Sequence, residues 1–225
     1  IGLGAYSLAR SRGESSGRDL ALALGAVLVV GGLSASAPRW DPSLMSTGLY
    51  RPVEAAKVAR YARSVGGEGS LVWRASRTER VLYYREGVNG SVLVGTDSEG
   101  SRRWLRVGGK VDASTGDMET QVLLGLIPAA LADSGARTLV IGLGSGITAA
   151  GVLAAGAGRT EVVELEPAVV EASRYFHGAG EDPLDDPRVR LVLGDARTHL
   201  AHGAGRYGLV VSQPSNPWIA SIVPG

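Results

Sequence analysis

Residues 137–166 read RTLVIGLGSGITAAGVLAAGAGRTEVVELE, and this stretch decides the fold. An apolar run at 137–142 leads into a glycine-rich turn, a helix-like segment at 147–156 and a second apolar run at 160–165. This order of strand, turn, helix and strand is typical of a β-α-β unit. The two strands of such a unit lie parallel and are joined by a right-handed crossover.

The same alternation continues downstream. We expect further strands at 188–193 and 207–212, and further helices at 167–175 and 196–201. The predicted fold class is therefore α/β, with a Rossmann-like core at 117–225. The chain starts without Met and stops just after a turn, so we expect a fragment whose core is truncated at its C-terminus.

A small antiparallel β unit is expected before the core. Strand-like runs occur at 70–74, 80–86, 90–95 and 103–107, with turn signals such as Asn89-Gly90 and Gly108-Gly109 between them. An amphipathic helix is expected at 53–64, and residues 117–131 have apolar positions at helical spacing. We assign 41–116 to this linker helix and β unit.

The N-terminal residues 1–40 are expected to associate with a membrane. Residues 20–38 carry no charge, and roughly 20 such residues cross a bilayer core. Arg39 and Trp40 follow as typical interfacial anchors. We predict a transmembrane helix at 20–38, preceded by a loop and the end of another apolar helix. A buried helix or a Gly/Ala-rich linker is the alternative.

The orientation of this segment is open from the sequence. The positive-inside rule places the loop that carries Arg10, Arg12 and Arg18 in the cytoplasm, which sends residue 40 onward to the other side. A domain that uses a cytosolic metabolite requires the opposite orientation. We expect a membrane-associated protein whose core domain faces the cytoplasm.

Composition excludes several classes of function. The 23 basic and 22 acidic residues give a net charge of +1 without a long basic run, so no nucleic-acid partner is expected. The absence of Cys excludes disulfides, thiolate metal sites and a Cys nucleophile. The three histidines, His177, His199 and His202, show no spacing with acids that predicts a metal site.

The first βα turn, Gly142-Leu143-Gly144-Ser145-Gly146, is the first candidate ligand site. Glycines allow sharp turns and a close approach of the backbone to a ligand, and the following helix offers free N–H groups. A tight structural turn is the alternative. A dinucleotide fingerprint requires Gly at 147, where Ile147 stands, so the spacing suits S-adenosyl ligands better.

Two acidic residues follow the next strands. Glu164 ends the second strand, where a carboxylate can accept hydrogen bonds from ribose hydroxyls, although a solvent-facing strand end is the alternative. Asp195, in Gly194-Asp195-Ala196, is placed to accept from an adenine amino group or to cap the next helix, and both roles can coexist. These positions lie at the carboxyl ends of parallel strands, so we expect a nucleoside site there.

With these residues identified, the chain resembles the polyamine aminopropyltransferase (spermidine synthase) family over about residues 80–217. Val163-Glu164-Leu165-Glu166 resembles the family's V-E-I-D, Leu184 to Val189 its L-D-D-P-R-V, and Gly194-Asp195-Ala196 its G-D-G/A. Gln121 falls at the Gln or His of the family's Y-Q/H-E. The run 212–218, SQPSNPW, resembles the S-E-P-S-N-P-W of membrane-fused members.

The resemblance implies decarboxylated S-adenosylmethionine or S-adenosylmethionine as co-substrate, without a metal. It implies an amine such as putrescine as the second substrate, and it leaves a homodimer open. The residues that it assigns to the adenosyl ligand are Gln121, Gly142, Gly144, Gly146, Glu164, Asp195 and Ala196.

The departures from the family concern the amine. Ser145 stands where typical members have Asp, and Gln213 and Asn216 replace two acids of the family's D-S-T-D-P loop. The resemblance places these three residues at the catalytic positions, where they predict an atypical neutral amine site. A methyltransferase is one alternative, although Val140 stands where many of those enzymes carry an acid. A non-catalytic nucleoside sensor of a membrane protein is the other, and the neutral trio favours it.

Overall fold

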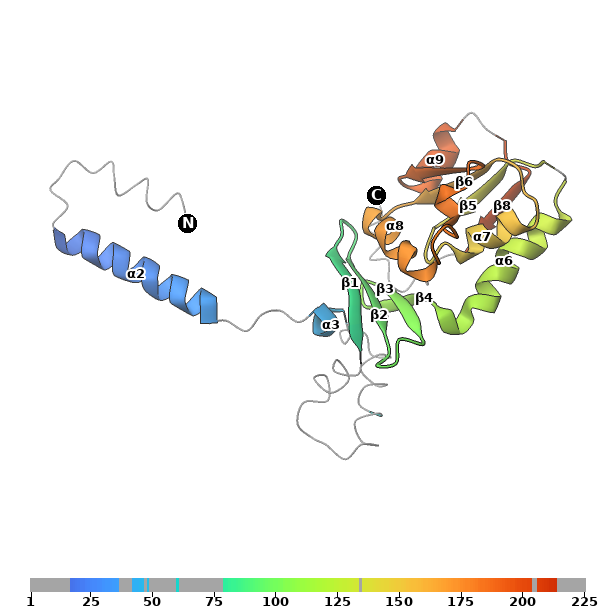
Figure 1. Ribbon diagram of the computed structural model, residues 1–225. Helices are drawn as coiled ribbons and strands as arrows, with labels where there is room; N and C mark the ends of the chain where they lie inside the picture. The colour runs from blue at the N-terminus through green and yellow to red at the C-terminus, as the bar shows by residue number, and fades with distance from the viewer. Residues whose placement is uncertain are drawn as a thin grey trace. The chain divides into compact units, whose positions relative to one another are not determined.

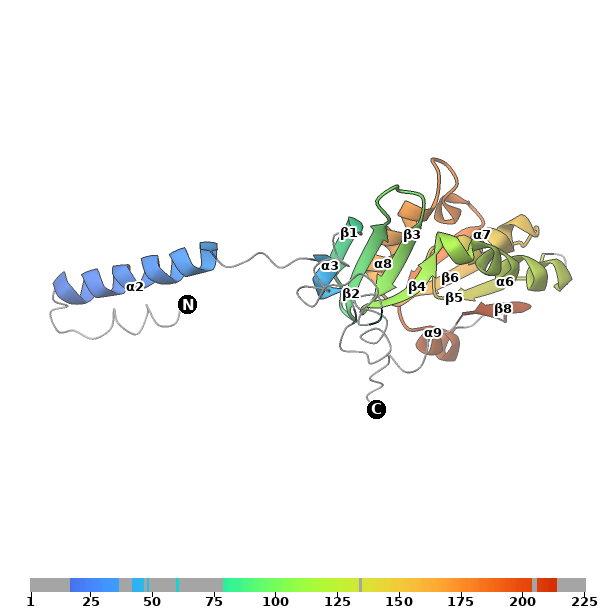
Figure 2. The same ribbon diagram turned by 90° about the horizontal axis from the view of Figure 1, so that it is seen from below.

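The computed structural model describes residues 17–36, 42–46, 48, 60, 79–133, 135–203 and 206–213. The chain divides into two units, Ile1–Trp40 and Asp41–Gly225. Figures 1 and 2 show the described elements from two directions. The predicted helix at 53–64, apart from Arg60, and the predicted strand at 70–74 lie outside the described residues, as does Asn216.

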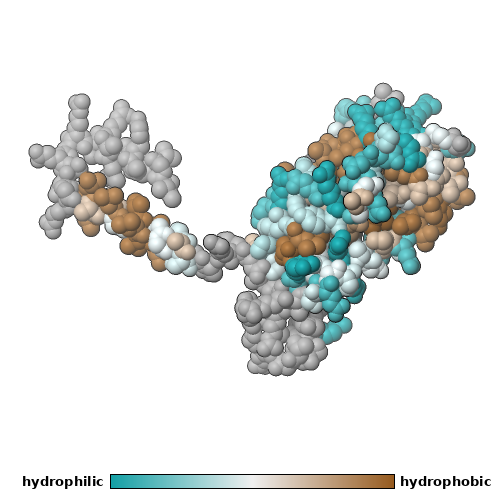
Figure 3. Space-filling view, in the orientation of Figure 1, coloured by the Kyte–Doolittle hydropathy of each residue, from teal (hydrophilic) through white to brown (hydrophobic). Residues whose placement is uncertain are grey.

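The first unit contains one described helix, α2 (Gly17–Ser36). A helix expected at 20–38 is therefore confirmed as far as Ser36. Its large apolar side chains are exposed from Leu20 to Leu33 (Figure 3). Within the described ranges, however, no helix combines the length and apolarity needed to cross a bilayer. The predicted transmembrane helix is therefore not supported.

In the second unit a short helix, α3 (Pro42–Met45), precedes a four-stranded antiparallel sheet. Its strands are β1 (Arg80–Glu86), β2 (Ser91–Thr96), β3 (Arg103–Val107) and β4 (Lys110–Ser114), paired in chain order. The predicted antiparallel β unit is confirmed at the first three, and β4 is an additional strand. Gly108 and Gly109 both have positive φ, as a two-residue hairpin between β3 and β4 requires.

Helix α6 (Met118–Leu131) connects the two sheets and confirms the helical spacing at 117–131. A 3-10 turn at Thr115–Asp117 leads into it, capped by the Ser114 side chain. Helix α6 packs closely on α7 (Ile147–Ala154), because glycines stand at the crossing. A Cβ atom at Gly125 would overlap the carbonyl oxygen of Thr148.

The second sheet is parallel, with the strand order β7-β6-β5-β8. Its strands are β5 (Thr138–Ile141), β6 (Thr160–Glu164), β7 (Val189–Leu193) and β8 (Leu209–Ser212). The remaining helices are α8 (Pro167–Ser173) and α9 (Ala196–His202), with 3-10 turns at Arg174–Phe176 and Pro183–Asp185. Figure 2 shows α6 and α7 on one face of this sheet and α9 on the other. The predicted β/α alternation is confirmed.

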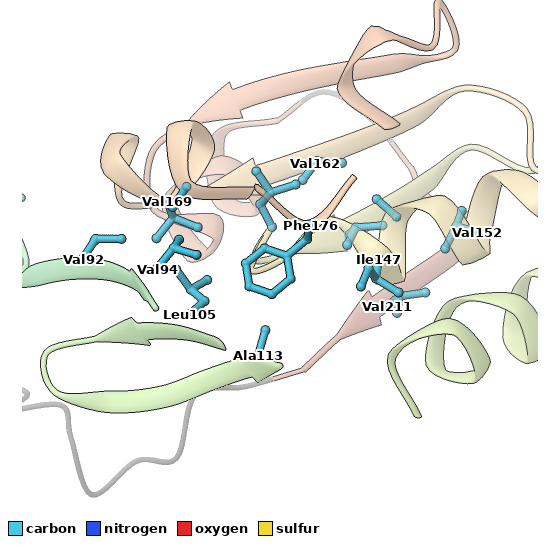
Figure 4. Close-up of a cluster of buried hydrophobic side chains, with 14 of the residues drawn as sticks. Val92, Val94, Leu105, Ala113, Ile147, Val152, Val162, Val169, Phe176 and Val211 are labelled. Carbon is cyan, nitrogen blue, oxygen red and sulfur yellow. The ribbon is translucent and has the colours of Figure 1, made fainter. Parts of the chain in front are cut away.

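One hydrophobic core joins the β unit to the parallel sheet. Phe176 lies between Leu105 and Ala113 of the β unit and Ile147 and Val162 of the core domain (Figure 4). Leu105 and Val162 are fully buried. Because the two sheets share this core, the β unit forms a fixed wall next to the carboxyl ends of the parallel strands.

Candidate functional site

A cavity of about 240 Å³ lies at the carboxyl ends of β5, β6 and β8, and we call it the strand-end pocket. The chain leaves β5 on one side toward β6 and returns on the other side as β8, so the strand order reverses here. Open α/β sheets bind ligands at such a reversal. The core domain lines the pocket with Gln121, Val140, Ile141, Gly142, Leu143, Gly144, Thr148, Glu164, Leu165, Glu166, Val169, Val211 and Gln213. The β unit contributes Asn89, Leu105, Val107, Lys110, Asp112 and Ala113.

The glycine turn has two kinds of glycine. Gly142, Gly144 and Gly146 all have positive φ, between 56° and 84°, which L side chains rarely adopt. Gly142 and Gly144 line the pocket, with open space where a Cβ would stand. Gly146 begins α7 instead, and its Cβ would lie 2.6 Å from His177 Nε2. The structure thus brings two of the three predicted glycines to the pocket, and the third serves packing.

Glu164 ends β6 and lines the pocket with its side chain nearly buried, 8% exposed. The backbone N–H of Leu143 donates to Oε2 at 2.7 Å, and that of Glu166 donates to Oε1 at 2.9 Å. The alternative of a solvent-facing strand end is therefore wrong. A carboxylate has about four lone-pair sites, so each oxygen keeps one for a ligand hydroxyl.

Asp195 and Ala196 do not line the pocket. Asp195 is exposed and caps α9, with Oδ1 accepting the backbone N–H of Thr198 at 2.7 Å. This hydrogen bond lowers the pKa of Asp195 below its ordinary value. The structure therefore shows the capping role, and the contact with adenine stays a prediction.

Gln121 and Ser145 form a buried pair. The Ser145 hydroxyl donates to Gln121 Oε1, while Gln121 Nε2 donates to the Ser114 carbonyl at 3.1 Å and to Asp117 Oδ1 at 2.9 Å. Ser145 is 2% exposed and does not line the pocket, whereas Gln121 does. The Ser145 hydroxyl is held by Gln121 of α6, and its predicted catalytic position stays a prediction.

Gln213 follows β8 and lines the pocket, and its position next to the amine stays a prediction. It is exposed, so its amide is accessible to a small molecule.

Sequence reasoning missed the charged residues from the β unit. Lys110 Nζ lies 2.6 Å from Asp112 Oδ1, and both side chains line the pocket. Side chains two positions apart on a regular strand lie on the same face. The spacing of Lys110 and Asp112 would therefore have suggested this pair if β4 had been predicted. Asn89 was also missed.

Glu166, the last residue of the Val163-Glu164-Leu165-Glu166 motif, has a structural role that its motif does not reveal. It is 4% exposed and accepts hydrogen bonds from Ala168 N at 3.2 Å and from Asn89 N at 2.9 Å. It caps α8 and fixes the β1–β2 hairpin at the rim of the pocket.

On the neighbouring turn of α8, Tyr83 donates to Glu171 at 2.9 Å. Burial and this carboxylate raise the pKa of Tyr83.

By sequence, the chain matches no protein-family profile and no curated protein. Its structure is similar to that of a spermidine synthase crystallised with the transition-state analogue AdoDATO, with a TM-score of 0.55 and 18% identity. That match covers 61% of this chain and 47% of the other. The spermidine synthase from Thermotoga maritima matches with a TM-score of 0.53 and 18% identity, over 59% of this chain and 47% of the other.

The chain thus spans about half the length of these solved structures, of which 47% is covered in each case. At a sequence identity of 18%, these matches show a similar fold and no more. What the matches show is an α/β fold, an antiparallel β unit followed by a parallel sheet, that resembles the fold of spermidine synthases.

Proposed function

We propose that residues 79–213 form an aminopropyltransferase-like domain. It binds decarboxylated S-adenosylmethionine, or a related adenosyl ligand, and transfers the aminopropyl group to an amine such as putrescine. One observation carries the proposal: Gly142, Gly144 and the Glu164 carboxylate border one pocket at the point where the strand order reverses. The fold likeness to spermidine synthases supports the same reaction class.

The pocket has the groups that a nucleoside needs. The open backbone at Gly142 and Gly144 admits the ligand closely, and the free lone pairs of Glu164 accept the ribose hydroxyls. Apolar side chains, Val140, Val169 and Val211, supply walls for the purine and the thioether. Asp195 would accept from the adenine amino group in this arrangement.

The transfer itself is a substitution at carbon. The lone pair of the neutral amine attacks the carbon bonded to the sulfonium, and the carbon–sulfur bond breaks with its electrons passing to sulfur. The products are methylthioadenosine, a neutral thioether, and an alkylated ammonium that loses one proton to a base. The protein therefore has to hold a cationic amine and accept one proton.

A non-catalytic nucleoside-binding domain is the second candidate, and Gln213 is the observation that favours it. Gln213 lines the pocket where the resemblance expects an acid, and an amide cannot take up the proton. Ser145, buried against Gln121, does not supply one either.

Calorimetry on the full chain tests the proposal, with methylthioadenosine, S-adenosylmethionine and its decarboxylated form as ligands. We expect methylthioadenosine to bind, and we expect the Glu164→Ala variant to bind it more weakly. Glu99→Gln is the matched control, because Glu99 is an exposed acid in the turn between β2 and β3. Failure of the parent to bind any of the three ligands overturns the proposal.

The reaction is followed by methylthioadenosine release from decarboxylated S-adenosylmethionine, with and without putrescine. Release that depends on putrescine supports aminopropyl transfer. Binding without release favours the sensor, and methyl transfer from S-adenosylmethionine would identify a methyltransferase.

A further inference from the structure

Two charged side chains of the β unit face the strand-end pocket. Lys110 and Asp112 stand two residues apart on β4, and both line the pocket. Their side chains are largely enclosed, at 22% and 19% exposed, and Lys110 Nζ lies 2.6 Å from Asp112 Oδ1. Val111, between them, is exposed.

The other acids that line this pocket are engaged by the protein. Glu164 accepts the backbone N–H groups of Leu143 and Glu166, and Glu166 accepts those of Asn89 and Ala168. These donors belong to the main chain and cannot move away without unfolding a turn or a helix end. Asp112 instead accepts from the end of a flexible lysine side chain, which can rotate away without moving the backbone.

The charge of the pocket favours a cation. Among the residues that line it, Asp112, Glu164 and Glu166 are acidic and Lys110 is basic, so acids outnumber bases. An opposite charge nearby stabilises the charged form of an amine. The ammonium of Lys110 is chemically the same group as the end of a diamine: a primary ammonium on an alkyl chain.

We propose that Asp112 binds the ammonium group of the acceptor amine, and that Lys110 occupies this place in the free protein. This inference rests on the proposed function, because it assigns the amine half of the same pocket. The substrate class is a primary alkyl diamine, whose one end is held while the other reacts. Asp112 takes over the charge-holding role that Gln213 cannot perform, and amine binding displaces Lys110.

Replacing Asp112 and replacing Lys110 should then change the putrescine affinity in opposite directions. In a purely structural ion pair, replacing either residue would lower it. The experiment titrates putrescine into the full chain saturated with methylthioadenosine and compares the parent with Asp112→Asn, Lys110→Met and the double variant. We expect Asp112→Asn to weaken putrescine binding about tenfold or more, the usual effect of losing a charge-assisted hydrogen bond. Lys110→Met should strengthen it, because the competing internal ammonium is gone.

The double variant separates binding from structure. If Asp112 binds the amine, its replacement costs more affinity in the Lys110→Met background than in the parent. If the pair is structural, both single variants lose affinity and the double variant recovers it, and that result overturns the proposal. Unchanged putrescine affinity in Asp112→Asn also overturns it. Methylthioadenosine binding by the parent is measured separately, so its failure points to the proposed function instead.

Discussion

The backbone N–H of Leu143 donates a hydrogen bond to Glu164 Oε2 at 2.7 Å, and this bond ties the glycine turn to the end of β6. The carboxylate expected to bind ribose therefore also shapes the turn before a ligand arrives. A preorganised turn lowers the ordering cost of binding. Binding and local stability are thus coupled at one side chain.

Replacing Glu164 by Ala should weaken methylthioadenosine binding by about tenfold to a hundredfold, roughly 1.5–3 kcal/mol for a charge-assisted hydrogen bond. It should also lower the melting temperature, because the N–H groups of Leu143 and Glu166 lose their acceptor. Glu164→Gln keeps one carbonyl oxygen and should lie between Ala and the parent in both measurements. Parent-like affinity in the Ala variant would place the ribose elsewhere.

Asp195 allows capping and ligand binding to be told apart. Asp195→Ala removes the acceptor for Thr198 N and should lower the melting temperature, whereas Asp195→Asn keeps a capping oxygen and should restore it. We expect both variants to bind methylthioadenosine more weakly than the parent, since each loses the anionic acceptor predicted for adenine. Calorimetry decides the point: full affinity in Asp195→Asn would limit this residue to capping.

A buried ion cluster at the opposite edge of the parallel sheet should set the acid stability of the domain. The side chain of Glu161 is 0% exposed, accepts from Arg137 and Tyr207, and has His199 Nε2 at 3.2 Å. Burial alone would raise the pKa of Glu161, but the hydrogen bonds from Arg137 and Tyr207 lower it below its ordinary value of 4.5. A carboxyl with a lowered folded pKa stabilises the fold above that ordinary value, and the contribution disappears as pH falls through the folded pKa.

Glu161→Gln should therefore destabilise the protein near pH 7. The difference from the parent should shrink as the pH falls below 4.5 and through the lowered pKa of the folded parent. At neutral pH the expected loss is about 1.5–3 kcal/mol, since hydrogen bonds to a buried charge are removed. Urea unfolding between pH 3 and 7 measures how the free energy of unfolding of the parent and of the variant changes with pH. A constant difference between variant and parent across this range would contradict the assigned titration.

The crossing of α6 and α7 gives a packing prediction. Ala normally stabilises a helix relative to Gly by about 1 kcal/mol, but a Cβ at Gly125 would overlap Thr148 O and lie 2.9 Å from Val152 N. We expect Gly125→Ala to destabilise the protein by about 1–3 kcal/mol, the usual cost of overpacking. Ala130→Gly, at an exposed position of α6, is the reference for propensity alone. A melting temperature of Gly125→Ala above that of the parent would refute the close approach of α6 to α7.

The parallel sheet could be predicted from the sequence because its strands are continuous apolar runs. The segments 138–141, TLVI, and 160–164, TEVVE, have β-branched residues at their centres and stand on either side of a glycine-rich turn and a helix-like segment, an order that the sequence shows. Strand β4 could not be found in this way. Its sequence, KVDAS, has few apolar residues, and it is a strand because it pairs with β3.

The site residues divide in the same way into those that local sequence predicts and those that depend on tertiary packing. Gly142, Gly144 and Glu164 could be placed because residues that follow parallel strands meet at one edge of the sheet. Lys110 and Asp112 come from another sheet, and only the shared core around Phe176 brings them to the pocket. The burial of Ser145 could not be predicted for a related reason: its partner, Gln121, lies on a helix 24 positions earlier in the chain, and local sequence does not reveal that hydrogen bond.

The last prediction concerns the proton in the transfer reaction. Gln213 lines the pocket and has the shape of a glutamate, yet its amide cannot accept a proton from the amine. We expect slow or absent putrescine-dependent release of methylthioadenosine from the parent, and Gln213→Glu should raise it, because general-base assistance is worth about 10²–10⁴-fold. Gln213→Leu is the control for shape and should give no gain.

Brisk turnover by the parent would show that a group other than residue 213 takes the proton. In that case Gln213→Leu should leave the activity in place. If neither the parent nor Gln213→Glu reacts although both bind methylthioadenosine, the pocket holds a nucleoside without transferring a group. The sensor function would then be the better account of this domain.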